Sequence, residues 1–218
     1  DVNVKYKFSG FTSVQFGQFK QPNSMEELSS TRFNDFISKA MTTNLQGVAR
    51  RTGVQVTTGG DAWTLTGSYM NRELTRNLAN GQGFGARGTF APMHDNGDIL
   101  HFGLSAVSFE AKDLLNDGRA RFRVRPDADL ASQRLIDSGQ FTDADQITTI
   151  GGEIAWVNGP VKLQAEAMNT NVTRDLNADY GFDSWYVSGL WNVSGETWSY
   201  KSGNLNTTLP EDPSKGMW

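Results

Sequence analysis

The sequence predicts an all-β protein, and more specifically a transmembrane antiparallel β-barrel. Three observations lead to this fold class. Runs of about 9–12 residues alternate apolar and polar side chains, and this length is close to that of a strand crossing a bilayer at a tilt. Glycine is frequent (23 of 218 residues) and aromatic residues reach 11%, although mean hydropathy is only −0.48. Short and long links between the runs alternate, as they do at the two ends of such a barrel.

Each alternating run places its apolar side chains on one face of the expected strand. In AWTLTGSYMN, Trp63, Leu65 and Tyr69 share one face, while Thr64 and Ser68 share the other. Similar runs give about nine strand candidates, among them residues 3–8, 11–20, 83–91, 98–110, 148–159, 160–169 and 184–195. A soluble β-sandwich with long loops is the alternative. The aromatic and glycine-rich apolar faces and the regular long runs favour the membrane barrel. Strand-end aromatics would then form interfacial girdles: Trp63, Tyr69, Trp156, Trp185 and Trp191.

The links divide into two kinds. Gly59–Asp61 and Asn158–Gly159 are suited to tight hairpin turns. Four links are long and are expected to be extracellular loops: 21–48, 71–82, 110–146 and 171–182. One of them contains the only expected helix, over 24–41, SMEELSSTRFNDFISKAM. Ser24 and Glu27 there have the spacing of a capping box, and a rough apolar stripe follows, formed by Leu28, Phe33, Phe36, Ile37 and Met41.

Composition excludes several classes of function. The chain has no cysteine, which rules out disulfides and thiolate sites, and two histidines are too few for a histidine-rich metal site. A net charge of −4 and a pI near 5.2 argue against general nucleic-acid binding. The residues show no catalytic triad and no phosphate-binding glycine loop, so we expect no enzyme, cofactor or metal. No run of 18 apolar residues predicts a membrane helix, and the N-terminal DVNVKYK lacks an apolar signal core.

Residues 119–125, RARFRVR, place an arginine at every second position. In a strand this period directs Arg119, Arg121, Arg123 and Arg125 to one face. Like charges so close repel unless water or an anion lies between them. With Arg134, residues 119–134 contain five of the twelve arginines, although the chain as a whole is negative. The alternative is a solvated loop face whose arginines meet water or lipopolysaccharide phosphates.

Several segments together resemble the phosphate-selective porin O/P family. They are GQFKQP (17–22), SSTRFNDFISKA (29–40), RARFRVRPDADLASQRLIDSG (119–139), SGETWSYKSG (194–203) and the final Gly216–Trp218. The resemblance implies a sixteen-stranded barrel in the bacterial outer membrane, usually a homotrimer, that conducts anions with a preference for phosphate. With about nine strand candidates, residues 1–218 are expected to be part of a single porin barrel domain whose other strands lie outside this sequence.

The resemblance also implies roles for the basic residues. The arginine ladder Arg119, Arg121, Arg123, Arg125, with Arg134, would line an in-folded loop and pass anions from one guanidinium to the next, since the planar fork matches phosphate oxygens. Arg50 and Arg51 would either form a constriction or anchor the barrel rim. Arg32 and Lys39 would either face the pore or pair with Glu26, Glu27 or Asp35. Lys20, Lys5, Lys7 and Arg87 could line the wall, where each is expected to pair with a wall acid such as Glu153 or Glu166. Glu196 is expected to pair within the wall.

The expected partners are inorganic phosphate or other small anions, the lipid bilayer and lipopolysaccharide. The charge pattern indicates the sign of the solute but not its identity, so pyrophosphate, sulfonates and small carboxylates stay open as solutes of a general or other-anion porin. A non-transporting outer-membrane β-barrel adhesin is the alternative from another class, in which the arginines would bind an external partner.

Overall fold

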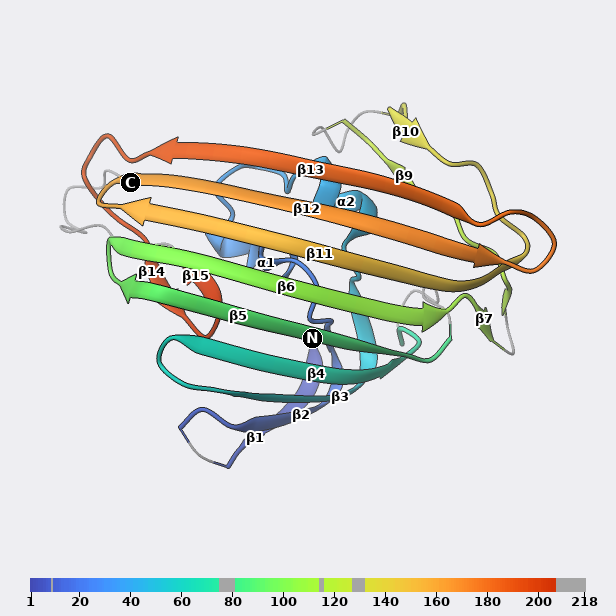
Figure 1. Ribbon diagram of the computed structural model, residues 1–218, viewed down its shortest axis with the longest axis horizontal. Helices are drawn as coiled ribbons and strands as arrows, with labels where there is room; N and C mark the ends of the chain where they lie inside the picture. The colour runs from blue at the N-terminus through green and yellow to red at the C-terminus, as the bar shows by residue number, and fades with distance from the viewer. Residues whose placement is uncertain (9, 75–80, 114–115, 127–131, 207–218) are drawn as a thin grey trace.

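Nine long strands form one antiparallel sheet in the computed structural model, which describes residues 1–8, 10–74, 81–113, 116–126 and 132–206 (Figure 1). Their order is β1-β2-β3-β4-β5-β6-β11-β12-β13, so every strand pairs with its neighbours along the chain. The bounds are β1 Val2–Lys7, β2 Ser13–Lys20, β3 Arg50–Gly59, β4 Trp63–Asn71, β5 Gly83–Asp95, β6 Asp98–Glu110, β11 Ala144–Asn158, β12 Val161–Arg174 and β13 Tyr180–Trp191. The predicted all-β fold class is confirmed, and β1 and β13 are the two ends of the sheet as described.

Short strands occur in pairs outside this sheet. They are β7 Lys112–Asp113 with β8 Asn116–Asp117, β9 Arg123–Val124 with β10 Ile136–Asp137, and β14 Ser199–Lys201 with β15 Asn204–Asn206. The first two pairs belong to the link between β6 and β11, which carries the arginine ladder. The third pair follows β13. The segment SGETWSYKSG (194–203) therefore contains β14, the turn that follows it and the residues that lead into it. Gly216–Trp218, the last part of the resemblance, lie outside the described residues.

The links between long strands follow the predicted alternation except at one place. Tight turns join β3 to β4, β5 to β6 and β11 to β12, the last with Gly159 at φ +54°. Long links run from 21 to 49, 72 to 82 and 111 to 143. The predicted long link 171–182 is wrong. Strand β12 continues through Arg174 and β13 begins at Tyr180, because residues as far as Val172↔Tyr180 still pair, and only 175–179 remain as a turn.

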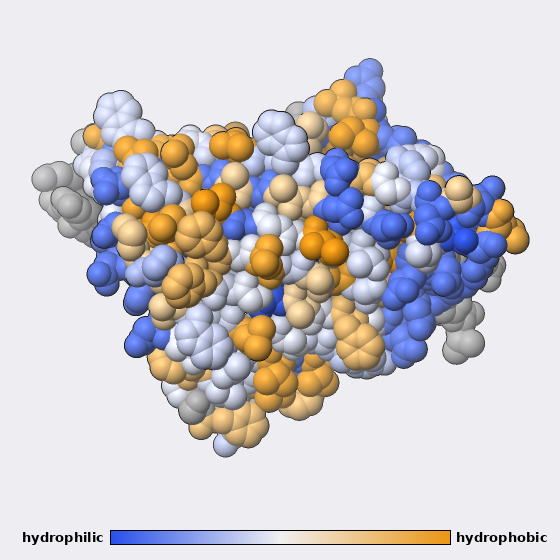
Figure 2. All heavy atoms as spheres, in the orientation of Figure 1, coloured by the Kyte–Doolittle hydropathy of each residue, from blue (hydrophilic) through white to orange (hydrophobic). Residues whose placement is uncertain are grey.

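Burial along the strands is the reverse of that in a soluble protein. On β12, Lys162, Gln164 and Glu166 are buried, whereas Leu163 between them is 48% exposed. Trp185 on β13 is 73% exposed. Figure 2 shows apolar side chains over the strands of this outer face, with hydrophilic side chains gathered most densely at the end that carries the long links. Such a face is stable where the solvent is hydrocarbon, which matches the predicted strand phase.

Two helices and a 3₁₀ turn lie on the polar face of the sheet: α1 Met25–Leu28, η1 Thr31–Phe33 and α2 Met41–Gln46 (Figure 1). The single helix predicted over 24–41 is therefore broken. Ser24 does cap α1, since its Oγ accepts the N–H of Glu27 at 3.1 Å. The Glu27 carboxylate, however, accepts from Lys39 Nζ at 2.7 Å. Ser29 ends α1 with an extended backbone while its hydroxyl donates to the Met25 carbonyl at 3.0 Å, which is how serine competes with helix continuation.

Two small apolar cores hold the in-folded segments against the sheet. The first lies toward the long links and contains Val48, Met70, Val107, Phe109, Ala111, Ala120, Phe141, Ala144, Ile147 and Val172. The second lies toward the short turns and contains Met25, Ile99, Ala155, Val157, Trp198 and Leu205. The ladder loop is thus packed at one end of the strands and the β14–β15 hairpin at the other. Among the residues that the structure describes, no helix is both long and apolar enough to cross a membrane.

Candidate functional site

The arginine ladder keeps its predicted alternation, although little of it is regular strand. Ala120 and Val124 are buried at 9% and 4% exposure, whereas Arg119, Arg121 and Arg123 are exposed. Only Arg123 and Val124 belong to a strand, β9, which pairs with β10. The apolar residues between the arginines pack against the wall, and three of the four arginine side chains are exposed.

Phe122 is the residue that seats the ladder. Its ring packs against Phe182 of β13 with centroids 4.9 Å apart, and against Phe141 at 6.4 Å. Its backbone N–H donates to Ser138 Oγ at 3.0 Å, and the Ser138 N–H donates back to the Phe122 carbonyl at 2.9 Å. The loop is therefore held at its centre by aromatic contacts, in addition to the backbone pairing of Ala120 with Phe141 and of β9 with β10.

Three arginines surround one cavity of about 280 Å³. It is lined by Arg123, Arg125 and Arg134 of the ladder loop, with Val124 and Pro126, and by Ser38 and Asn44 of the segment that carries α2. Desolvation first, and then the like charges of Arg125 and Arg123, lower the pKa of Arg134. A site where guanidiniums destabilise one another in this way favours a bound anion, whose charge would relieve the repulsion.

A second cavity, of about 220 Å³, brings the two predicted arginine groups together. Arg51 of β3 lines it beside Arg119 and Arg121, and the α2 side contributes residues 45–48. Arg51 is 8% exposed and its guanidinium lies 5.3 Å from the centroid of Phe109. Its Nη1 donates to the Arg50 carbonyl at 3.2 Å, while among the described residues its buried Nε has no hydrogen-bond partner. An unsatisfied buried donor is costly, and an anion or water in the cavity would remove that cost.

Arg121 of the ladder forms an ion pair with Asp137. Arg121 Nε donates to Asp137 Oδ1 at 2.8 Å and its Nη2 donates to the other carboxylate oxygen. This hydrogen-bonded pair lowers the pKa of Asp137 to about 2. Both side chains are well exposed, so the pair adds little to stability and mainly orients the Arg121 fork.

Three of the remaining predicted cations, Lys39, Lys20 and Arg50, line neither of these two cavities. Lys39 pairs with Glu27, and Lys20 Nζ donates to the Ser29 carbonyl at 2.9 Å, so both lysines hold the segment 21–48 in place. Arg50 pairs with Asp1. Arg32 lies in η1, and its side chain is outside the described part of the chain. On the wall, Arg87 Nε donates to Glu153 Oε1 at 2.9 Å.

The expectation for Glu196 is wrong. Its carboxylate accepts from the Ser194 hydroxyl within the same turn, and its backbone carbonyl accepts from Asn192 Nδ2 at 2.8 Å. Glycine at 195 has φ +99°, a conformation that closes this turn and directs the carboxylate back onto it. Glu196 therefore stabilises a local turn rather than the wall.

Sequence reasoning missed two groups of residues, one at the arginine cavities and one on the wall. Ser38 and Asn44, which complete the 280 Å³ cavity, carry no local signal because only the fold brings them beside the ladder. His101 is fully buried between Glu153 Oε1 and the Tyr200 hydroxyl, at 2.9 and 2.8 Å. The available signal was the position of His101, which shares the inward-facing side of an otherwise apolar strand. Within the described ranges, no three histidine, aspartate or glutamate side chains are grouped so as to hold a metal ion.

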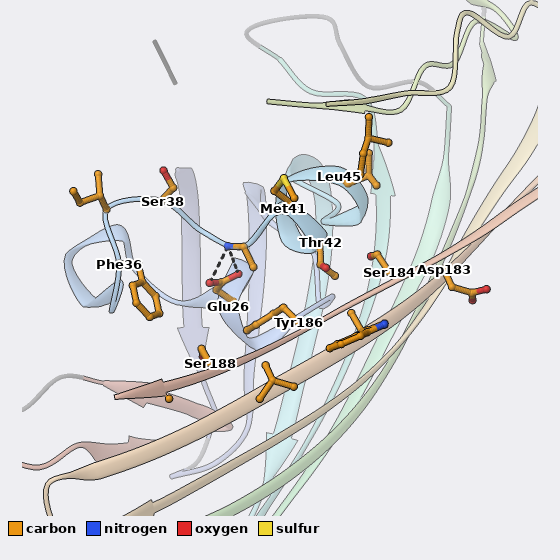
Figure 3. Close-up of a pocket in the computed structure, with 16 residues that line it drawn as sticks. Glu26, Phe36, Ser38, Met41, Thr42, Leu45, Asp183, Ser184, Tyr186 and Ser188 are labelled. Carbon is orange, nitrogen blue, oxygen red and sulfur yellow. Dashed lines mark hydrogen bonds between the residues drawn. The ribbon is translucent and has the colours of Figure 1, made fainter. Parts of the chain in front are cut away.

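A larger groove of about 890 Å³ lies between the α1–α2 segment and β13 (Figure 3). Figure 3 shows Glu26 facing the side chains that β13 presents, and its carboxylate accepts the N–H of Ala40. Asp183 is the other charged side chain of this lining. Burial raises the pKa of Glu26. Because both charged groups of this lining are acidic, the groove does not suit an anion, in contrast with the two arginine cavities.

The fold and the site together define a class of protein. An antiparallel sheet with an apolar outer face and segments packed on its polar face is the architecture of membrane proteins of the porin class. The chain belongs to the family described as phosphate-selective porin O and P, whose model matches residues 1–218.

Two curated relatives are consistent with this family. The chain is 28% identical to Porin O of Pseudomonas aeruginosa over 156 residues, which is 62% of this chain and 35% of that protein. It is 24% identical to a protein of Caulobacter vibrioides, described as uncharacterized, over 227 residues, or 99% of this chain and 45% of that protein. The chain thus spans less than half the length of these relatives.

Proposed function

We propose that the protein is part of a bacterial outer-membrane porin that conducts anions, with phosphate favoured, along the arginine ladder. The observation that carries the proposal is the meeting of two distant groups of arginines. Arg51 lies beside Arg119 and Arg121 in one cavity, and Arg123, Arg125 and Arg134 surround the next. Family membership supports transport, and the apolar outer face supports a place in the bilayer.

The arrangement suggests how an oxyanion would pass. Each guanidinium presents a planar set of donors that matches two phosphate oxygens and stays charged at every physiological pH. Two adjoining sites with several forks let an ion exchange one set of donors for the next without a long stay at either. Selective conduction requires this balance, since binding must be strong enough to admit the ion and weak enough to release it.

Residues 1–218 would then contribute nine strands to a single barrel domain, and sequence outside this chain would supply the rest. Closure is required because unpaired strand edges are not stable in hydrocarbon. The proposal includes a homotrimer and contact with lipopolysaccharide, both of which the resemblance to the family suggests. No cofactor or catalytic step enters it.

The test uses the full-length parent protein in a planar bilayer. We would measure the reversal potential in a KCl gradient and the block of chloride current by added phosphate. The double variant Arg123→Ala/Arg125→Ala should weaken the phosphate block about tenfold, equivalent to about 1.4 kcal/mol. Lys112→Ala is a control for the loss of positive charge at the same end of the strands, where Lys112 pairs with Asp175 and Asp145, although it removes one charge instead of two. A cation-selective or phosphate-insensitive parent would contradict the proposal.

Other anions form the second candidate, and Arg123→Lys/Arg125→Lys separates it from the first. Lysine keeps the charge but not the fork. Loss of phosphate block with retained chloride selectivity would identify oxyanion recognition by the guanidiniums. Equal block by phosphate, sulfonate and carboxylate in the parent would indicate a general anion porin. An inserted protein without measurable conductance would favour the adhesin alternative.

A further inference from the structure

The wall residue Glu166 binds the backbone of the segment 21–48. Glu166 lies on the polar face of β12 and is 3% exposed. Its Oε2 accepts the N–H of Met25 at 3.1 Å, and its Oε1 accepts the N–H of Glu26 at 2.9 Å. The Tyr186 hydroxyl of β13 donates to the same Oε1 at 2.7 Å. One carboxylate thereby joins two wall strands to the start of α1, about 140 positions away in sequence.

Two more contacts on the same strand face hold other parts of the segment. Lys162 forms a buried ion pair with Asp35, and the Thr170 hydroxyl accepts from Gln46 Nε2 at 2.8 Å. Lys162, Glu166 and Thr170 follow one another at every fourth residue, so they are spaced about 13 Å apart along β12. This row contacts the segment near its beginning, middle and end, and Glu166 is its central member.

The shape of both arginine cavities depends on the position of the segment 21–48. Ser38 and Asn44 complete the cavity of Arg123, Arg125 and Arg134. Residues 45–48 complete the cavity of Arg51. Each cavity therefore has the ladder on one side and the segment on the other, and a displacement of the segment would widen both. The Glu166 carboxylate binds backbone N–H groups and a phenol, so its negative charge is engaged away from the proposed anion path.

We propose that Glu166 is the positioning residue of this path, and that it sets the width of both arginine cavities by fixing the segment 21–48 to β12. Oxyanion affinity is then determined by a residue that does not touch the anion. The inference rests on the proposed function only for its consequence on anion block, because the geometry of the segment can be measured independently.

The first experiment compares Glu166→Ala and Glu166→Gln in the full-length parent. Alanine removes all three accepted hydrogen bonds, whereas glutamine keeps one acceptor oxygen. The half-blocking phosphate concentration should rise about tenfold in Glu166→Ala, and less in Glu166→Gln. Glu153→Gln is the matched control, since it removes the same charge from the same wall face but bonds Arg87 and His101 instead of the segment. It should change the block less than about twofold. Recording single channels restricts the comparison to protein that has folded and inserted.

The second experiment measures the position of the segment directly. Residues 1–218 contain no cysteine, so spin labels are placed at Ser38→Cys and Asp183→Cys after any cysteine elsewhere in the parent is replaced. They report the distance between the segment and β13. Glu166→Ala should broaden the distribution of this distance. In Glu166→Gln the distribution should be narrower than in Glu166→Ala. An unchanged distribution together with unchanged block would overturn the inference. A broadened distribution in a protein whose parent is insensitive to phosphate would support the positioning role while removing the proposed phosphate path.

Discussion

The guanidinium of Arg121 and the carboxylate of Asp137 form a two-point ion pair that engages the Nε and Nη2 donors of one ladder arginine. Asp137→Asn should release this fork and remove a negative charge beside the cavities. We expect the half-blocking phosphate concentration to fall about threefold, with little change in stability, because the pair is exposed. Block measured in single channels and melting temperature in detergent would check both parts. Weaker block in Asp137→Asn would show that Asp137 orients Arg121 for the anion.

The same pair predicts a flat pH response. The pKa of Asp137 is lowered from its ordinary value to about 2, so the contribution of the pair is present above the unfolded value and is lost only as pH falls toward 2. Phosphate itself changes charge in this range, so the block is first corrected for that change. The contribution of this pair to the corrected block should therefore be constant between pH 8 and pH 5. Asp137→Asn should shift the whole curve without changing its shape. A difference in shape between variant and parent in that range would contradict the assigned pKa direction.

Phe122 should be the most sensitive apolar residue of the ladder. Phe122→Ala removes the ring that contacts Phe182 and Phe141, and because the ring is only partly buried we expect a loss of about 1–2 kcal/mol in the free energy of unfolding. The ladder should also become mobile, which would raise open-channel noise. Phe122→Leu is the control that keeps most of the apolar volume. Urea unfolding in detergent and single-channel noise are the two measurements, and a quiet channel in Phe122→Ala would show that β9–β10 pairing alone holds the loop.

The strands could be predicted from the sequence because their signal is local. A period of two, as in Trp63, Leu65 and Tyr69, is written in adjacent residues and needs no knowledge of the fold. The helix over 24–41 could not be predicted correctly. Glu27 has the spacing of a capping box with Ser24, but its carboxylate binds Lys39 in the structure. The arginines were recognisable as a ladder, whereas their assembly with Arg51, Ser38 and Asn44 depends on contacts between distant segments.

Glu26 should make the segment 21–48 sensitive to pH. Its carboxylate accepts from the Ala40 N–H and from Thr43, and burial raises its pKa above the ordinary value. A raised pKa means that the folded state holds its proton more tightly than the unfolded state. Stability should therefore increase as pH falls through the folded pKa. Glu26→Gln cannot ionise, so its melting temperature should depend less on pH between 7 and 4 than that of the parent. An identical pH dependence in both proteins would assign the effect to another group.

The buried pair of Arg87 and Glu153 supports the last prediction. Arg87 donates to Glu153 and also to the Gly203 carbonyl at 2.7 Å, and His101 and Tyr200 extend the network to the β14–β15 hairpin. Arg87→Met leaves the Glu153 carboxylate buried with one partner fewer, so we expect a loss of about 3–5 kcal/mol in the free energy of unfolding. The double variant Arg87→Met/Glu153→Met removes both charges and should recover a large part of that loss. Urea unfolding of the parent, both single variants and the double variant closes the cycle. Additive losses would show that the two side chains act separately, and that the hairpin is held by its apolar core of Trp198 and Leu205 instead.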